Sequence, residues 1–323
     1  MRRPPRWLLR AAQLVLAGLI TWGLYRMVGV DLGRLNAREF ARWRPAVAPL
    51  AASTGLLLAV FLAHALLWRR IVGDVLGRAP SITAAMRVYF VSALGRYIPG
   101  KLWQLTGLAL LARRAGIPAV PATAAALIGQ IGFLTTGGLF LTLLLPGWAG
   151  PGPALAAALV MVVLAGTMLW LATGHGARTR AALVRRFPLL ESAVNVLARI
   201  RAREALLWVI GYGITWVMLG LAFSLFVIAF APGASGSTRH LAGTVAAAYL
   251  GGYVAVFAPA GVGVREGVMA VLLAQVVPAP AAFLVSVASR LWFTVAELLP
   301  LAVLLLPAPG PAAPSESDGR SVG

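Results

Sequence analysis

The sequence contains no cysteine and few charged residues. The absence of cysteine excludes disulfides, cysteine-based zinc sites and thiol catalysis. Charged residues make up 11% of the chain, whereas a soluble domain carries about 25%. So few charges cannot cover a surface that faces water, and 60% of the 323 residues are hydrophobic. The composition therefore predicts an all-α, polytopic membrane protein.

Acidic residues and lysine are also scarce. The chain has 28 basic residues against 9 acidic ones, and Lys101 is the single lysine. In a soluble protein this balance would suggest nucleic acid as a partner. Here the arginines cluster between apolar segments, as they do when positive charge orients a membrane protein, so no nucleic-acid partner is expected.

Groups that could hold a metal or perform covalent catalysis are missing from the sequence pattern. The three histidines, His64, His175 and His240, have no metal-ligand spacing, and no Ser/His/Asp or paired-carboxylate arrangement is apparent. We therefore expect no metal, no cofactor and no enzymatic activity. His64 is interpreted as a helix-packing residue.

Apolar runs of about 20 residues are long enough to cross a bilayer as helices. Two further apolar segments, 82–111 and 241–277, are interrupted by glycine, proline and charge, which predicts broken or re-entrant helices. We expect one transmembrane domain over 1–306, with halves of about 1–150 and 151–306, and a disordered Pro/Ala/Ser-rich tail over 307–323. The predicted full spans are 7–28, 46–68, 122–146, 153–172, 205–230 and 280–306.

The arginine-rich loops predict the orientation. Loops 69–81, 113–121 and 174–204 fall on one side, which the distribution of positive charge identifies as cytoplasmic, together with the N-terminus. The 26–45 loop then lies outside with five arginines against two acids, which opposes this orientation. The reverse orientation would export far more arginine. The prediction is a multi-pass protein of the cell membrane.

The two interrupted segments occupy corresponding places in the chain. Pro99 and Pro259 are 160 residues apart (259 − 99), and Gln130 and Arg290 each follow their own proline by 31 residues. With the orientation above, one segment enters from the cytoplasm and the other from outside. This pattern predicts an inverted-topology repeat, in which discontinuous helices form a substrate site near the midplane.

The first interruption, 95–104, combines helix breakers with charge. A helix that begins after Pro99 would direct its N-terminal amides, with their partial positive charge, into the membrane interior. Arg96 and Lys101 add two full charges, and Gln104 closes the segment. Such a place suits an anion, and the abundant anion of a membrane is a lipid phosphate. Alternatively, Arg96 and Lys101 extend to the cytoplasmic headgroups.

The second interruption contains Pro259, Gly261, Gly263 and Glu266. Adjacent residues point apart on a helix, so Glu266 and its neighbour Arg265 are not expected to pair. The expected partner of Glu266 is Arg290.

The last predicted span carries two charges in its interior. Arg290 and Glu297 are seven residues apart and share one helical face. Charges inside a span normally face the interior of the bundle and are functional; the alternative is a buried structural ion pair. Gln130, also in mid-span, is either a headgroup ligand or an interhelical hydrogen-bond donor.

These motifs resemble those of the lysylphosphatidylglycerol synthase transmembrane-region family, also described as flippase-like. An Arg-x-x-Pro-Gly-Lys motif is matched at 96–101, a Pro-x-Gly-x-Gly-x-x-Glu motif at 259–266, and a later arginine at Arg290. The resemblance covers residues from about 10 to 306. Synthase members continue into an aminoacyl-transferase domain, whereas this sequence ends at Gly323, so lysyl transfer is not expected.

The resemblance implies a flippase-like protein that moves an anionic phospholipid or a lipid-linked glycan between leaflets. Arg96, Lys101 and Arg290 would hold the phosphate in a cationic cavity, and Glu266 would position Arg290 or bind an amine headgroup. The main alternative is an accessory subunit that presents a polyprenyl-phosphate lipid to a membrane glycosyltransferase partner. An intramembrane enzyme and a small-anion transporter are further alternatives. The candidate site residues are Arg96, Pro99, Gly100, Lys101, Gln104, Gln130, Pro259, Gly261, Gly263, Glu266 and Arg290.

Overall fold

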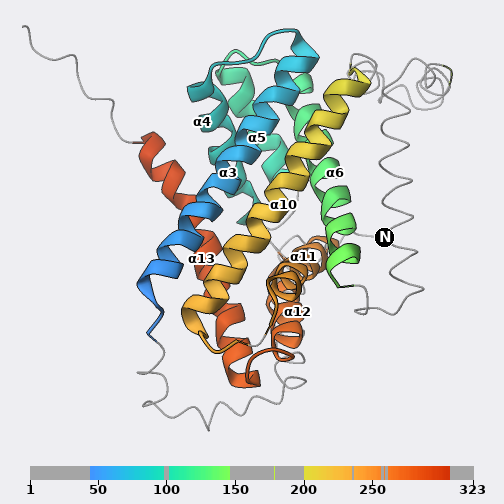
Figure 1. The fold of residues 1–323 in the computed structure, drawn as a ribbon. Coiled ribbons are helices and arrows are strands. Elements are labelled where there is room, and N and C mark those ends of the chain that lie inside the picture. The colour runs from blue at the N-terminus through green and yellow to red at the C-terminus, as the bar shows by residue number, and fades with distance from the viewer. Residues whose placement is uncertain are drawn as a thin grey trace, which may run out of the picture.

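The computed structural model describes residues 44–97, 102–145, 178, 200–234, 236–255, 258 and 261–305, and its regular elements in these ranges are helices (Figure 1). The order along the chain is α3 (Val47–Leu76), α4 (Ile82–Ala93), the 3-10 helix η2 (Leu94–Tyr97), α5 (Leu102–Arg114), α6 (Ala119–Leu144), α10 (Ala202–Phe230), α11 (Thr238–Val254), α12 (Val264–Leu273) and α13 (Ala279–Leu305).

Four of these helices are long and apolar enough to cross a membrane, namely α3, α6, α10 and α13. They coincide with the predicted spans 46–68, 122–146, 205–230 and 280–306, and the prediction of an all-helical polytopic protein is confirmed. The predicted spans 7–28 and 153–172, most of the loop 174–204 and the tail 307–323 lie outside the described residues.

Helix α3 is longer than predicted. It continues past Trp68 to Leu76, so the first part of the predicted loop 69–81 is helical. The apolar side chains at 71, 72 and 75 are buried, and their burial stabilises the additional helical turns. Arg70 also forms an i,i+4 ion pair with Asp74 at 3.0 Å. The helix ends at Gly77, whose φ of 75° is readily adopted only by glycine. The arginine pair was therefore a wrong marker for the end of the helix.

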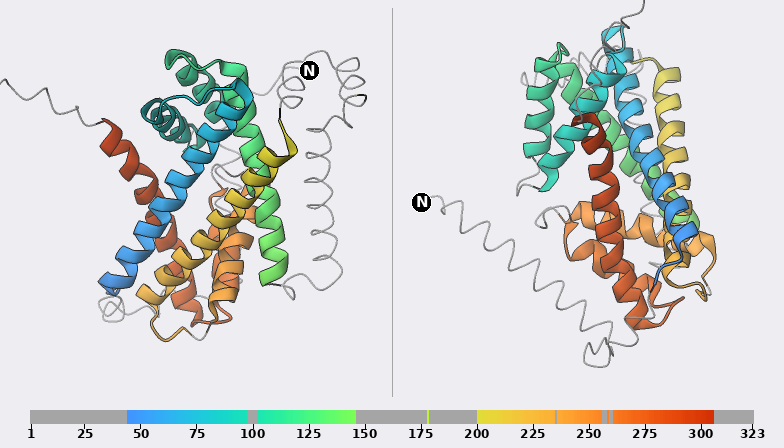
Figure 2. Two further views of the ribbon diagram at one scale, coloured as in Figure 1. Left: turned by 45° about the horizontal axis from the view of Figure 1, so that its top comes forward. Right: turned by 90° about the vertical axis from the view of Figure 1, so that its left-hand side faces the viewer.

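The two broken segments lie at opposite ends of the bundle (Figures 1 and 2). Helices α4 and α5 are at the upper end in Figure 1, and α11 and α12 are at the lower end. Each broken pair stands between two long helices, and α3 runs upward whereas α10 runs downward. The described helices thus have the order and the opposite directions that an inverted repeat requires.

Helix α10 packs against α3, α6, α11 and α13. Its Trp216 is fully buried, stacks on Phe133 of α6 at 4.5 Å between ring centroids, and donates its indole N–H to the Phe133 carbonyl oxygen at 2.8 Å. A buried indole N–H has no water partner in a membrane, so this bond fixes the register of α6 against α10. The rings of Trp216 and Phe133 thus form an aromatic contact between α10 and α6.

The outward faces of the long helices carry large apolar side chains. Exposed fractions are 80% at Val47, 67% at Leu291 and Val303, and 61% at Leu143. An apolar surface of this kind belongs against lipid. Polar and charged groups in the interior therefore require a separate explanation.

Candidate functional site

The first break brings η2 against the start of α5. A Cβ atom on Gly95 would lie 2.7 Å from Cα and 2.8 Å from N of Gln104, closer than side chains tolerate. Glycine therefore permits this contact, which sets Arg96 and Gln104 at one place in the hairpin. The neighbouring predicted residues Pro99, Gly100 and Lys101 lie outside the described residues.

Arg96 forms an ion pair with Glu297 of α13, with 2.9 Å between Nη1 and Oε1. The exposed fractions are 30% for the Arg96 side chain and 9% for that of Glu297. Arg96 also donates from Nε to the Ala93 carbonyl oxygen at 3.2 Å. The pair therefore connects the first hairpin with the last long helix. Removing one member of such a buried pair leaves an uncompensated charge and costs about 3–5 kcal/mol.

A cavity of about 90 Å³ lies at this ion pair. At about 30 Å³ for each water, it has room for roughly three water molecules. Helices from both halves of the chain contribute to its wall, including α3, α4, α5, α6, α10, α11 and α13. Of the predicted site residues, Arg96, Gln104 and Gln130 line this cavity.

His64 of α3 lines the same cavity and also packs against Phe133, edge to face at 4.8 Å. Its Nε2 lies 3.0 Å from Oγ1 of Thr215, and the Thr215 hydroxyl donates its hydrogen to the Tyr212 carbonyl oxygen at 2.8 Å. Since a threonine hydroxyl has a single hydrogen, which here goes to the Tyr212 carbonyl oxygen, we assign Nε2 as the donor to Thr215. In the neutral imidazole, Nδ1 is then an acceptor. His64 therefore packs between helices, as predicted, and in addition lines the cavity.

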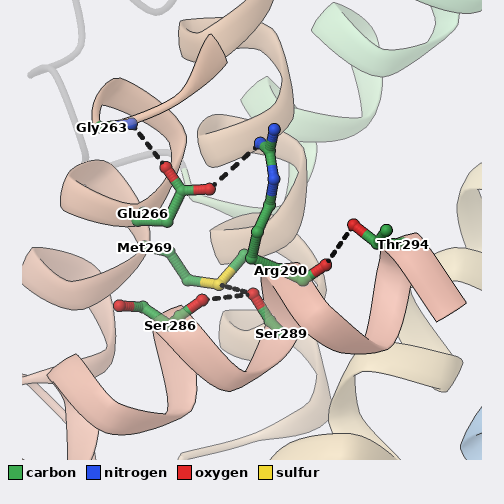
Figure 3. A network of polar contacts seen from close by, with 7 residues as sticks. All are labelled: Gly263, Glu266, Met269, Ser286, Ser289, Arg290 and Thr294. Atoms are coloured by element: carbon green, nitrogen blue, oxygen red, sulfur yellow. Dashed lines mark hydrogen bonds and ion pairs between the residues drawn. The ribbon is translucent and has the colours of Figure 1, made fainter. Parts of the chain in front are cut away.

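Glu266 and Arg290 form a second polar group between α12 and α13 (Figure 3). Nη1 of Arg290 lies 3.2 Å from Oε1 of Glu266, which confirms the predicted pairing. The other carboxylate oxygen accepts the Gly263 N–H at 2.7 Å, at the N-terminus of α12. A carboxylate at this end also interacts favourably with the helix dipole. Neither Glu266 nor Arg290 belongs to the wall of the cavity.

The glycines of the second break allow backbone conformations and a close helix contact that other residues would not. Gly261 has a φ of 70°, and a Cβ atom there would lie 2.8 Å from Cα of Gly252 on α11. Gly263 has a φ of 85°. Both positions favour glycine for its conformational freedom. The predicted residue Pro259 lies outside the described residues.

Arg265 is a residue that the sequence interpretation did not include in the site. Its guanidinium lies over the ring of Phe293, at 3.8 Å from the centroid, and at 5.2 Å from the centroid of Tyr249. Both rings line the cavity. Its Nη2 is buried and forms no hydrogen bond within the described residues. The sequence did contain a signal for Arg265. Once Glu266 is paired with Arg290, the adjacent Arg265 is a charge at a predicted helix break that still needs a partner.

Metal ligation finds no support at this site. Over the ranges that the structure describes, no three His, Cys, Asp or Glu side chains form a group that could hold an ion.

The fold and the interior polar groups define a polytopic α-helical membrane protein. The family model described as the lysylphosphatidylglycerol synthase TM region matches residues 7–300. The chain therefore belongs to this family, a membrane domain of lipid-related proteins. A search of curated proteins and a search of solved structures returned no match.

Proposed function

We propose that this protein moves a lipid between the leaflets of the cell membrane, with the headgroup passing through the cavity at Arg96 and Glu297. The observation that carries the proposal is a cavity with charged and polar side chains on part of its wall, inside an apolar bundle, with side chains from both broken helical segments lining it. A buried charge pair in hydrocarbon is expensive unless it is used, and intramembrane ionisable residues mark substrate pathways.

The dimensions of the cavity suit a headgroup rather than a whole lipid. A volume of about 90 Å³ cannot contain acyl chains. The chains gain about 0.8 kcal/mol per CH₂ from remaining in hydrocarbon. Movement is therefore cheapest when the headgroup crosses through protein while the chains stay in the bilayer.

The orientation follows from the arginines at the helix ends. Arg69, Arg70, Arg78, Arg113, Arg114, Arg201 and Arg203 are at the end that carries α4 and α5, whereas Arg44 and Arg239 are at the end of α11. Since cytoplasmic ends collect basic residues, we assign the α4–α5 end to the cytoplasm. This assignment gives the N-terminus a cytoplasmic position if 7–28 is a span.

The anionic part of the headgroup is the proposed partner of Arg96, with Lys101 and Arg290 as further predicted cations. Glu266 fixes Arg290 in one position through their ion pair. Its second oxygen is occupied by the Gly263 N–H. This arrangement supports the positioning role of Glu266 over direct binding of an amine headgroup.

The test is transbilayer movement of tail-labelled phosphatidylglycerol in proteoliposomes that contain the purified protein. We expect Arg96→Gln and Glu297→Gln each to lower the rate on the order of tenfold, which corresponds to about 1.4 kcal/mol. The matched control is Arg70→Gln, which neutralises an arginine that is 61% exposed near the end of α3 and does not line the cavity.

Three results are decisive in this assay. Loss of movement in the two cavity variants, with the Arg70 variant unchanged, supports the proposal. Unchanged movement in both cavity variants overturns the assignment of the pathway. A folded wild type that retains lipid without moving it favours the accessory subunit, which presents a lipid to a membrane glycosyltransferase.

A further inference from the structure

The wall of the cavity combines one ion pair with several neutral polar side chains. The pair, Arg96 with Glu297, contributes one positive and one negative charge, so these two charges cancel. The Ser92 hydroxyl and the Trp68 indole N–H also lie on the wall, but each donates to a backbone carbonyl oxygen. The other neutral groups are the side chains of His64, Tyr89, Gln104, Gln130, Tyr212 and Tyr249. Most of the polar side chains on the wall are therefore neutral hydrogen-bonding groups.

These six side chains keep hydrogen-bond donors or acceptors that no other described residue fills. The amides of Gln104 and Gln130 and the hydroxyls of the three tyrosines form no hydrogen bond with any described residue, and His64 uses Nε2 alone. Their polar atoms face the cavity and not the packed interior, since the buried side-chain atom without a partner among the described residues is Nη2 of Arg265. Six groups with unused donors or acceptors around one small space therefore offer hydrogen bonds to whatever occupies it, water or a ligand.

The balance of donors and acceptors identifies the kind of ligand. An amide and a phenol each donate and accept, and Nδ1 of His64 accepts only. A phosphate oxygen only accepts hydrogen bonds, so it cannot bond to Nδ1, which is also an acceptor. An ammonium donates only, so it would leave the donors of the wall unused. A hydroxyl group donates and accepts, and thus matches the whole set.

Size and shape agree with this assignment. Room for roughly three waters corresponds to about three hydroxyl groups, as in glycerol or one edge of a sugar ring. The rings of Trp68, Phe133 and Phe293 provide apolar surface between the polar groups. The C–H faces of a polyol can pack on such rings while its hydroxyls reach the amides and phenols.

We propose that the neutral side chains of the cavity wall bind the hydroxyl groups of an uncharged polyol, either glycerol or a sugar, while any anionic group of the same lipid stays at Arg96, and that hydroxyls rather than charge select the lipid. This inference rests on the proposed function, because it assigns a headgroup class to the same cavity. The glycerol of a phospholipid and the sugar of a glycolipid share this chemistry.

The experiment compares lipids that differ only in hydroxyl groups, by native mass spectrometry of the purified protein after exchange into each lipid with the same acyl chains. Phosphatidylglycerol is compared with phosphatidic acid, which lacks the headgroup glycerol, and glucosyl diacylglycerol with diacylglycerol. We expect about tenfold greater retention of the hydroxylated member in at least one pair. A preference in the first pair identifies glycerol, and a preference in the second identifies a sugar.

Two variants locate the preference in the cavity. Tyr249→Phe removes one hydroxyl and keeps the ring, so it is expected to fold, and it should lower the preference about threefold to tenfold. Gln130→Leu should lower it by a similar factor. The matched control is Gln275→Leu, because Gln275 is exposed in the turn after α12.

The outcomes separate this inference from the proposed function. Equal retention within both pairs overturns the inference, as does a preference that survives both cavity variants; cavity water alone would then account for the polar wall. In either case, lipid movement measured separately can still support the proposed function. A hydroxyl preference that both variants lower, without any lipid movement, supports the inference and overturns the transport proposal.

Discussion

Replacement of Glu297 by glutamine removes one charge from the pair that joins the first hairpin to α13. The carboxylate is 9% exposed and lies 2.9 Å from the Arg96 guanidinium. Loss of one partner of a buried pair costs about 3–5 kcal/mol; since Arg96 retains an exposed fraction of 30%, we expect the low end of that range. The expected decrease in the free energy of unfolding for Glu297→Gln is therefore ~3 kcal/mol.

A double-mutant cycle isolates the interaction from the other contacts of both residues. Unfolding of the wild type, Arg96→Gln, Glu297→Gln and the double variant is followed by denaturant titration in mixed micelles. Residues in one ion pair show a coupling energy of about 0.5–3 kcal/mol, so the double variant should be more stable than the sum of the single effects predicts. The control is Arg70→Gln: the Arg70 side chain is 61% exposed, and its partner Asp74 keeps the Trp208 indole N–H at 3.0 Å, so the expected cost is about 0–1 kcal/mol.

The reasoning would be refuted by additive effects of the two substitutions. It would equally be refuted if Glu297→Gln cost no more than Arg70→Gln. Either result would mean that the charges at Arg96 and Glu297 are stabilised independently of each other, and that the cavity is not built around their pairing.

Two further predictions concern the packing that forms the cavity. Gly95→Ala should lower the free energy of unfolding by about 2 kcal/mol or more, because the new methyl would meet the Gln104 backbone; Gly55→Ala, at an open position inside α3, should be neutral or raise it by up to about 1 kcal/mol, and equal effects would argue against the contact. Trp216→Phe should cost about 1–2 kcal/mol in the same titration, because the Phe133 carbonyl oxygen loses its indole donor, and an unchanged stability would contradict that bond.

The general architecture could be predicted because it follows from composition and local pattern. Apolar run length located the four long helices, and the glycines and charges of 82–111 and 241–277 located the breaks between shorter helices. The Glu266–Arg290 pair was also predictable. Each of these two intramembrane charges needs a partner, and the adjacent residue of Glu266 points away from it.

The partner of Arg96 could not be predicted in the same way. Arg96 and Glu297 are separated by 201 residues (297 − 96), and the sequence groups Glu297 with Arg290 because they share a helical face. In the fold, Arg290 reaches α12 and Glu297 reaches η2. Helical periodicity predicts the side of a helix on which a residue lies. It does not predict how neighbouring helices are aligned along their axes, which depends on contacts such as the hydrogen bond of the Trp216 indole.

The cavity itself was predicted only as a cationic space. Tyr89, Tyr212 and Tyr249 are ordinary amphipathic residues in an apolar sequence, and nothing in their spacing brings them together. They meet because α4, α10 and α11 converge on one point. Whether the predicted residues bind substrate remains a prediction for all of them, including Pro99, Gly100, Lys101 and Pro259 outside the described ranges.

The most direct test of the central claim asks whether a lipid headgroup enters the cavity. Since the chain has no cysteine, a single one at Ala126, on the cavity wall, can be labelled with a membrane-impermeant maleimide in proteoliposomes. Ile214→Cys is the control, because this residue is 55% exposed on the apolar outer face. The account predicts that Ala126→Cys reacts, that the transported lipid slows the reaction several-fold, and that Ile214→Cys does neither. Lipid movement that continues while the reaction of Ala126→Cys is indifferent to lipid would contradict the account.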